Sequence, residues 1–251
     1  PQELTPAPIN LRSRVHGYGG GVLSTSFDGD VLLLAWIDDS DGCLWAQSWQ
    51  GLSCRNIDQE NWLKPRESPK RLSCKADYLL ADGSIDPFQS RWIGVMEREG
   101  KDFLVDFDLN KVDQMPRVLH RAQDFAGYAA LSPDGTQLAW VEWQHPDMPW
   151  DASQLWWGRF DEIGRIVEKK LLAGNSSPTL PKTSVFQPIW LPSGELLVSE
   201  DSSGWWNLMV LENKNDFDND PLWRRLWSME AETALPQWIY GMSTTASVGK
   251  K

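Results

Sequence analysis

The sequence predicts an all-β fold made of repeated four-stranded units. Short apolar strands alternate with turns rich in Gly, Pro, Asp and Ser; at 131–143, for example, Ser132-Pro133-Asp134-Gly135 separates two strands. No segment keeps apolar residues at helical spacing for three turns. The third strand of each unit recurs at steps of 59, 52 and 52 residues, with these markers at its middle: Trp45, Leu104, Trp156 and Leu208. A period near 50 is typical of a β-propeller with one blade per repeat.

The first two blades are expected at 15–75 and 76–122. The run Val31-Leu32-Leu33-Leu34-Ala35-Trp36 is continuously apolar, which is typical of a strand buried on both faces. Polar outer strands are expected near 70–73 and 116–119, because Lys and Arg suit a sheet edge exposed to water.

The third and fourth blades are expected at 123–175 and 183–229, with the same order of turns and strands. The ends, 1–14 and 230–251, are interpreted as pieces of flanking blades: 1–6 as an outer strand, and 237–243 as the entry to a further blade. A closed ring of seven blades needs roughly 350 residues. We therefore expect a partial propeller of about four blades, truncated at both ends, whose open edges favour aggregation or dimerisation.

The composition limits the classes of function. The chain has 251 residues, an apolar fraction of 41%, 16 tryptophans and a formal net charge of −11. Such an acidic surface argues against nucleic-acid binding, and no basic run or long apolar run favours membrane binding. Most tryptophans are interpreted as core residues. The odd set of thiols, Cys43, Cys54 and Cys74, favours reduced cysteines and a cytoplasmic location.

No catalytic, metal or cofactor residue is predicted. The segment Gly241-Met242-Ser243-Thr244-Thr245 lacks the closing Gly of a nucleophile elbow, and no helix is expected after it. The histidines, His16, His120 and His145, share no short spacing of the kind that builds a local metal site. The glycines after His16 are interpreted as a place where two backbones approach closely.

One loop is a candidate for contact with a substrate or with another domain. It runs over 143–151, and its candidate residues are His145, Asp147, Trp150 and Asp151. Two prolines, two tryptophans, a histidine and two carboxylates in one connection are typical of functional loops. The alternative is a rigid loop that packs on its own blade or on a neighbouring domain.

Several stretches together resemble a known family. The most specific are His145-Pro146-Asp147-Met148-Pro149-Trp150-Asp151 and Pro236-Gln237-Trp238-Ile239-Tyr240-Gly241-Met242-Ser243, supported by 14–21, 186–190 and 203–208. In this order they resemble the β-propeller region of prolyl oligopeptidase-family serine peptidases, in particular the dipeptidyl aminopeptidase and acylaminoacyl-peptidase-like branch.

The resemblance implies a role as a non-catalytic cap. In that family a propeller covers an α/β-hydrolase domain and limits access to short peptides. The hydrolase domain is not in this sequence, so we expect the chain to be inactive alone, and its expected partners are that domain of a longer parent chain and short peptides. Two alternatives remain: a stand-alone TolB-like propeller acting as a protein-interaction scaffold, and a carbohydrate-binding propeller that uses exposed tryptophans.

Overall fold

The computed structural model describes residues 2–51, 63–174, 181–212 and 220–247. Within these ranges the regular structure is β-strand, apart from one 3₁₀ turn, η1 (Val15–Gly17). Blade 1 contains β1 (Leu23–Phe27), β2 (Val31–Ile37), β3 (Leu44–Gln50), β4 (Lys64–Pro65) and β5 (Lys70–Arg71). Blade 2 contains β6 (Leu79–Asp86), β7 (Arg91–Arg98), β8 (Lys101–Asp108) and β9 (Arg117–Arg121). The predicted absence of long helices is confirmed for the described residues.

The second half of the chain repeats this arrangement. Blade 3 contains β10 (Phe125–Leu131), β11 (Gln137–Trp143), β12 (Gln154–Phe160) and β13 (Ile166–Ala173). Blade 4 contains β14 (Val185–Trp190), β15 (Leu196–Glu200), β16 (Asn207–Leu211) and β17 (Trp223–Arg225). Every sheet is antiparallel and follows chain order, except that β4 and β5 both pair with β3. The predicted all-β partial propeller of four blades is confirmed.

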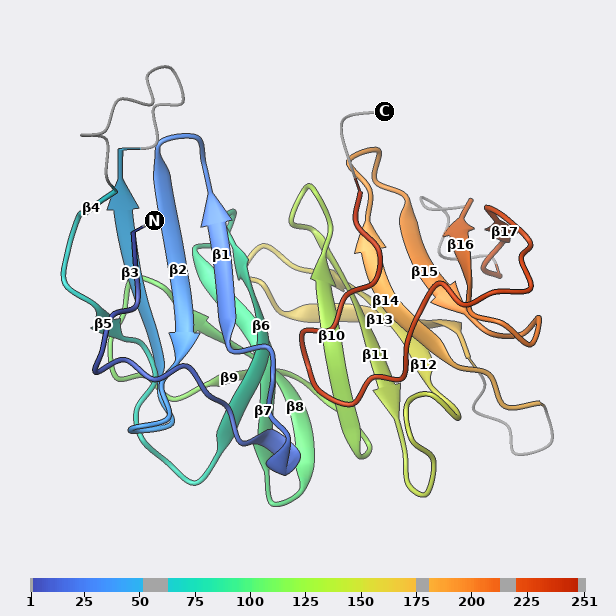
Figure 1. The fold of residues 1–251 in the computed structure, drawn as a ribbon, viewed down its shortest axis with the longest axis horizontal. Coiled ribbons are helices and arrows are strands. Elements are labelled where there is room, and N and C mark those ends of the chain that lie inside the picture. Colours follow the sequence, from blue (N-terminus) through green and yellow to red (C-terminus); the bar gives the residue numbers. More distant parts are fainter. Residues whose placement is uncertain (1, 52–62, 175–180, 213–219, 248–251) are drawn as a thin grey trace.

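The four sheets stand side by side around the inner edge formed by their first strands (Figure 1). Strand β6 contacts β1 and β10, and β10 contacts β14. Three apolar clusters fill the spaces between successive blades. Each of these clusters contains one buried tryptophan, Trp92, Trp140 or Trp157, at most 2% exposed, and the equally buried Trp36 lies in a separate cluster of blade 1. A flat ring buries a large apolar area between two sheets, so the interpretation of these tryptophans as core residues is confirmed.

A bulge interrupts the first strand of blades 2, 3 and 4 at the same place. The pairing register with the second strand shifts after Ala81, Gly127 and Phe186. The residue that follows each shift has a positive φ: Asp82 at 52°, Tyr128 at 57° and Gln187 at 56°. A bulge twists a strand and redirects its backbone groups. Here the side chains of two bulge residues, Asp82 and Gln187, bond to the backbone of the C-terminal segment.

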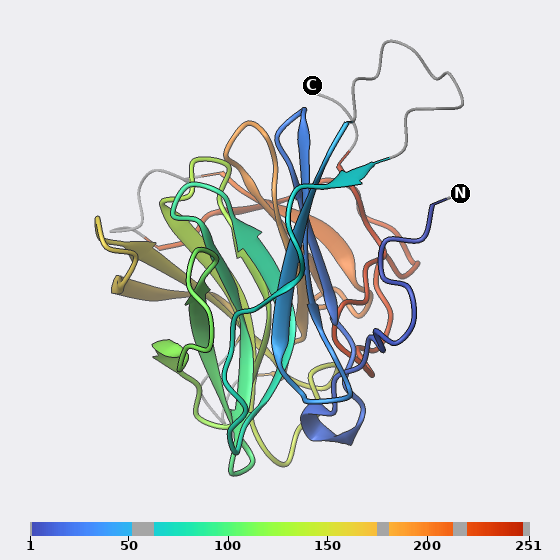
Figure 2. The same ribbon diagram turned by 90° about the vertical axis from the view of Figure 1, so that its left-hand side faces the viewer.

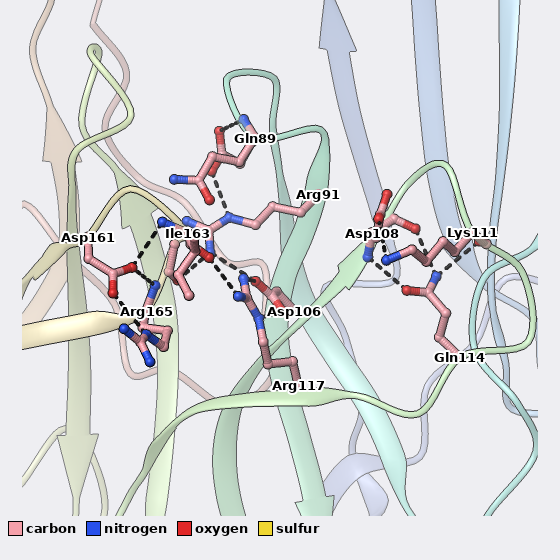
Figure 3. A network of polar contacts seen from close by, with 12 residues as sticks. Gln89, Arg91, Asp106, Asp108, Lys111, Gln114, Arg117, Asp161, Ile163 and Arg165 are labelled. Atoms are coloured by element: carbon pink, nitrogen blue, oxygen red, sulfur yellow. Dashed lines mark hydrogen bonds and ion pairs between the residues drawn. The ribbon is translucent and has the colours of Figure 1, made fainter.

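Blades 2 and 3 are also joined by a buried ionic network (Figure 3). The Arg91 guanidinium donates to Asp86 at 2.8 Å and to Asp106 at 2.9 Å, and all three side chains are at most 4% exposed. Arg91 also donates to the Gly164 carbonyl in the β12–β13 turn of blade 3, at 2.7 Å. Arg117 donates to Asp106 and to the carbonyl of Ile163 in the same turn. The network therefore fixes the blade 3 turn against blade 2.

The N-terminal segment differs from the prediction of an outer strand over 1–6. Residues 2–10 form no strand; next to β4 it is the side chain of Gln2, not the backbone of the segment, that bonds to the backbone of Leu63. Instead, Leu4, Ile9 and Leu11 pack on a cluster of blade 1 that contains Trp36 and Trp49. Figure 2 shows the segment running beside the first sheet down to η1.

The C-terminal segment returns to the beginning of the chain. After β17 it crosses the ends of blades 4 and 3 and reaches the inner edge (Figure 1). There Tyr240 forms a parallel bridge with Gly20, and its N–H donates to the Gly19 carbonyl at 3.2 Å. The strand entry predicted over 237–243 is thus limited to this single bridge. A Cβ on Gly20 would lie 2.3 Å from the Tyr240 carbonyl oxygen, which confirms the predicted close backbone approach.

Candidate functional site

Four separate stretches of the chain meet in one apolar pocket, here called the aromatic pocket. It has a volume of about 160 Å³. The residues that line it come from η1 and the turn after it, from β10 and the β11–β12 loop, and from the C-terminal segment: Val15, His16, Tyr18, Gly19, Phe125, Tyr128, Trp143, His145, Asp147, Met148, Pro149, Gln237, Trp238, Ile239 and Tyr240. The pocket exists only because the C-terminal segment returns to the start of blade 1.

Antiparallel topology explains why these stretches share one end of the propeller. Strands alternate in direction, so the connection into the first strand of a blade and the connection between its second and third strands lie at the same end. This end, the lower one in Figure 1, is called the entry face. Four of the pocket residues on it are large, apolar and exposed: Tyr18, Met148, Trp238 and Ile239.

Aromatic rings form the walls of the pocket. Phe125 stacks on Trp143 with ring centroids 5.6 Å apart, and the edges of His16 and His145 meet it at 5.0 and 5.1 Å. Trp143 also lies 6.4 Å from the Tyr240 ring. Offset and edge-to-face contacts at such distances are favourable, and each ring holds its neighbour in place.

His16 is held by two carboxylates behind the pocket wall. Its Nε2 lies 2.9 Å from the buried Asp102, and its Nδ1 lies 3.6 Å from Glu97, which also accepts the His16 backbone N–H. Partial burial opposes protonation of the ring, but the hydrogen bond and charge of Asp102 and the charge of Glu97 outweigh it, so the pKa of His16 is raised. Both ring nitrogens therefore face protein carboxylates.

The tyrosines of the pocket connect it to the bulged strands. The Tyr240 hydroxyl lies 3.1 Å from Asp102 and 2.9 Å from the Ala126 carbonyl, and the Tyr128 hydroxyl donates to the Ile239 carbonyl at 3.2 Å. Burial raises the pKa of both tyrosine hydroxyls, and nearby carboxylates raise it further. Both groups are therefore neutral donors.

Asp82, in the bulge of β6, also binds this part of the C-terminal segment. Its carboxylate accepts the backbone N–H of Tyr128 and that of Gly241. Burial raises the pKa of Asp82 to about 6, while these two hydrogen bonds lower it. Asp82 thus holds the C-terminal segment against the bulge of β10.

The four candidate residues of the 143–151 loop have different positions. His145 and Asp147 line the aromatic pocket, and Asp147 is paired with Lys182 at 2.5 Å. Trp150 lies behind the rim, with its ring 4.6 Å from that of Trp238. The Asp151 carboxylate accepts the Met148 N–H at 3.3 Å, which closes the loop on itself. Two of the four therefore face the pocket, and two support its rim.

Ser243 is not arranged as a nucleophile. Its hydroxyl lies 3.0 Å from the Gln187 amide, which donates to it, and donates to the Thr245 carbonyl at 3.1 Å. Of the histidines, His16 contacts Asp102, His120 contacts Glu142 at 2.7 Å, and His145 contacts Phe125.

The potential metal ligands and thiols lie apart from one another. Within the described residues, no three His, Cys, Asp or Glu side chains gather as metal ligands would. Cys43 and Cys74 are free thiols, whereas Cys54 lies outside the described residues. None of the described ranges contains a helix with the length and apolar character of a membrane span.

Several pocket residues were not predicted from the sequence. Phe125, Trp238 and Tyr240 look like ordinary strand or core aromatics in the sequence, and His16 looks like part of a turn. The only available signal is that the three stretches supporting the family resemblance (14–21, 145–151 and 236–243) all contribute to one site.

The comparison with solved structures finds proteins that are similar to this chain. No family model matches the chain, and no curated protein sequence matches it. Among solved structures, puromycin hydrolase is 29% identical with a TM-score of 0.74, over 94% of this chain and 35% of that one. A puromycin-hydrolyzing peptidase of Mycobacterium tuberculosis is 25% identical with a TM-score of 0.74, over 96% of this chain and 36% of that one. The chain thus spans about a third of the length of these peptidases.

Two more distant structures share the fold alone. Prolyl oligopeptidase B from Galerina marginata is 11% identical with a TM-score of 0.52, over 85% of this chain and 30% of that one. A TolB from Agrobacterium tumefaciens is 15% identical with a TM-score of 0.53, over 83% of this chain and 62% of that one. The resemblance predicted from the sequence is confirmed: over nearly its whole length the chain is similar to the β-propeller domain of prolyl oligopeptidase-family serine peptidases.

Proposed function

We propose that this chain is the non-catalytic propeller cap of a longer parent protein, and that it gates the access of peptides to a serine peptidase domain. The observation that carries the proposal is the entry face, where Tyr18, Met148, Trp238 and Ile239 expose apolar surface around one pocket. Exposed apolar surface gathered in one place typically marks a surface that another domain or a ligand covers. The covering partner is the α/β-hydrolase domain of the same parent chain, in line with the chain spanning 35% of puromycin hydrolase.

Gating follows from size selection. A cap held against a catalytic domain admits a short peptide and excludes a long polypeptide such as casein. The substrates are therefore short peptides, the reaction is carried out by the hydrolase domain, and this chain supplies no catalytic group. This chain alone hydrolyses no chromogenic peptide with a free or blocked N-terminus; turnover abolished by Ser243→Ala would contradict that.

The test uses the parent chain and two substrates, a short chromogenic peptide and casein. Replacing Met148 and Ile239 together by Asp places charges in the proposed contact, where they lose hydration without gaining partners. The rate on casein relative to the short peptide then rises about tenfold or more, as expected when a contact weakens by about 1.4 kcal/mol.

A matched control distinguishes the entry face from the surface in general. Val112 and Ile163 are exposed apolar residues in the connections after β8 and β12, at the opposite end of the blades. The double change of these two residues to Asp leaves the casein-to-peptide ratio unchanged. An unchanged ratio in the Met148 and Ile239 variant would overturn the cap proposal, and would favour the TolB-like scaffold alternative if the reading frame also ended at Lys251.

A further inference from the structure

We infer that the aromatic pocket is a binding subsite for one aromatic side chain of a peptide ligand. This inference rests on the proposed function in one respect, namely that the ligand is a peptide arriving at the entry face. The ring-binding property itself is argued from the pocket alone.

The size of the pocket fits a single ring. Its volume is about 160 Å³. An apolar cavity of about 150 Å³ in a protein interior is large enough to hold one benzene molecule. A Leu or Met side chain would also fit, so size alone does not select an aromatic ligand.

The aromatic residues that form the walls favour an aromatic ligand. The Phe125 ring already stacks on Trp143 and meets the edges of His16 and His145, with centroids 5.0 to 5.6 Å apart. A further ring extends this arrangement and gains the quadrupole interactions that an aliphatic side chain lacks. The aromatic walls therefore favour an aromatic guest over an aliphatic guest of equal volume.

The polar groups of the wall do not need a polar guest. His16 directs both ring nitrogens to Asp102 and Glu97. The Tyr240 hydroxyl faces the Ala126 carbonyl and Asp102, and the Tyr128 hydroxyl donates to the Ile239 carbonyl. An apolar ring in the pocket therefore leaves His16 Nε2 and the two tyrosine hydroxyls with their protein partners.

The pocket is formed before a ligand arrives. The loop over 145–151 is fixed by the Asp151 cap on the Met148 N–H and by a hydrogen bond of 2.7 Å from the Ser184 hydroxyl to the Pro149 carbonyl. On the other side, Tyr240 is bridged to Gly20. A preformed pocket avoids the entropy cost of ordering loops on binding.

The experiment uses this chain and fluorine NMR with N-acetyl-4-fluorophenylalaninamide as the probe. A ligand of this size is expected to bind with a Kd on the order of 1 mM, detected as saturable broadening of the fluorine signal. Unlabelled N-acetylphenylalaninamide displaces the probe. N-acetylleucinamide displaces it at least about fivefold less well, and N-acetylalaninamide does not displace it.

Two exposed tryptophans provide a matched pair of variants. Trp238 lines the pocket and is 59% exposed, whereas Trp227 is 65% exposed and does not line it. Trp238→Ala weakens probe binding about fivefold or more, and Trp227→Ala leaves it unchanged. Ile239→Trp fills the mouth of the pocket and also weakens binding, which provides a second test if Trp238→Ala fails to fold.

Three results would overturn the inference: no saturable binding up to about 20 mM probe, equal displacement by the leucine and phenylalanine amides, or equal effects of the two tryptophan variants. None of these bears on the cap, which is tested on casein with the parent chain. The two experiments can therefore give different answers. The chain can act as a cap without binding an aromatic ring, or it can bind an aromatic ring without acting as a cap.

Discussion

Gly20 allows the C-terminal segment to approach the backbone at the start of blade 1. Its φ is +94°, and a Cβ there would lie 2.3 Å from the Tyr240 carbonyl oxygen. Gly29 is a suitable control, because its φ is +101° and a Cβ at that position would have no neighbouring atom within 4 Å. Both sites disfavour an L-residue, but only Gly20 combines this with a backbone collision.

Gly20→Ala is therefore expected to destabilise the chain more than Gly29→Ala does. Backbone strain costs about 1–2 kcal/mol in both variants, and the collision adds about 1–3 kcal/mol in Gly20→Ala alone. Urea unfolding measures both free energies. Equal losses would mean that the bridge between Gly20 and Tyr240 does not contribute to the folded state.

His16 gives the stability of the entry face a pH dependence. Its pKa is raised in the folded state, because Asp102 and Glu97 outweigh the opposing effect of burial. A raised pKa means that the folded state binds the proton more tightly than the unfolded state does. The stabilisation is therefore complete below the unfolded pKa of about 6.5 and is lost as the pH rises through the folded pKa.

The free energy of unfolding is expected to fall from pH 6 to pH 9 more steeply in the unaltered chain than in His16→Asn. Asn is chosen because it tolerates the φ of 50° at this position. The measurement is urea unfolding at several pH values. Both proteins retain Asp82, whose pKa is raised to about 6 by burial, so its titration contributes equally to the two curves. Parallel curves would exclude a charged His16 in the folded state.

The ionic network of Figure 3 stabilises the contact between blades 2 and 3. Arg91 is 2% exposed and pairs with Asp86 and Asp106, and its guanidinium also packs 4.3 Å from the Phe160 ring. Without the Arg91 guanidinium, the buried carboxylates of Asp86 and Asp106 have less positive charge beside them. Breaking a buried ion pair from one side typically costs about 3–5 kcal/mol.

Arg91→Met is thus expected to reduce the free energy of unfolding by about 3–5 kcal/mol. The control is Arg159→Met, which breaks the exposed pair with Glu168 (side chains 54% and 41% exposed) and costs less than about 1 kcal/mol. Chemical unfolding of both variants measures the difference. A loss of similar size in the two variants would show that burial does not strengthen this network.

The strands are predictable because their signals are local. Turn residues and alternating apolar residues mark most strands directly, and the marker positions Trp45, Leu104, Trp156 and Leu208 all fall in third strands. The strand expected over 1–6 does not form within the described residues 2–6, because the Gln2 side chain takes the place of backbone pairing at Leu63, which the pattern alone does not reveal. The bulge at Tyr128 is equally hidden, since a bulky residue such as tyrosine rarely adopts a positive φ.

The aromatic pocket depends on the whole molecule, and this limits its prediction. His16, Phe125 and Tyr240 come from the beginning, the middle and the end of the chain, and no local pattern shows that the C-terminal segment returns to Gly20. The sequence does single out the loop with His145 and Asp147, because an unusual composition is a local property. It does not separate these two residues from Trp150 and Asp151, whose roles depend on which way the loop folds.

The terminal segments also bear on how the molecule behaves in solution. The sequence alone predicts that an open propeller associates through its exposed blades. In the structure, Ile9 and Leu11 cover the outer apolar cluster of blade 1, and Ala234 and Met242 cover Phe186 and Trp206 in blade 4. Because these covers hide apolar faces that would otherwise be open, we expect the chain with its termini intact to be monomeric.

Removing the cover on blade 1 is then expected to cause association. Ile9→Ser with Leu11→Ser leaves the cluster around Trp36 and Trp49 without its apolar partners, and exposed patches of this kind pair with each other. Size-exclusion chromatography with light scattering should show a monomer for the unaltered chain and a dimer or larger species for the double variant. Val112→Ser, at a site that is 57% exposed, serves as a control and leaves the mass unchanged. A dimer in the unaltered chain would mean that the N-terminal segment does not seal blade 1, and that the open edges dominate as the sequence alone predicts.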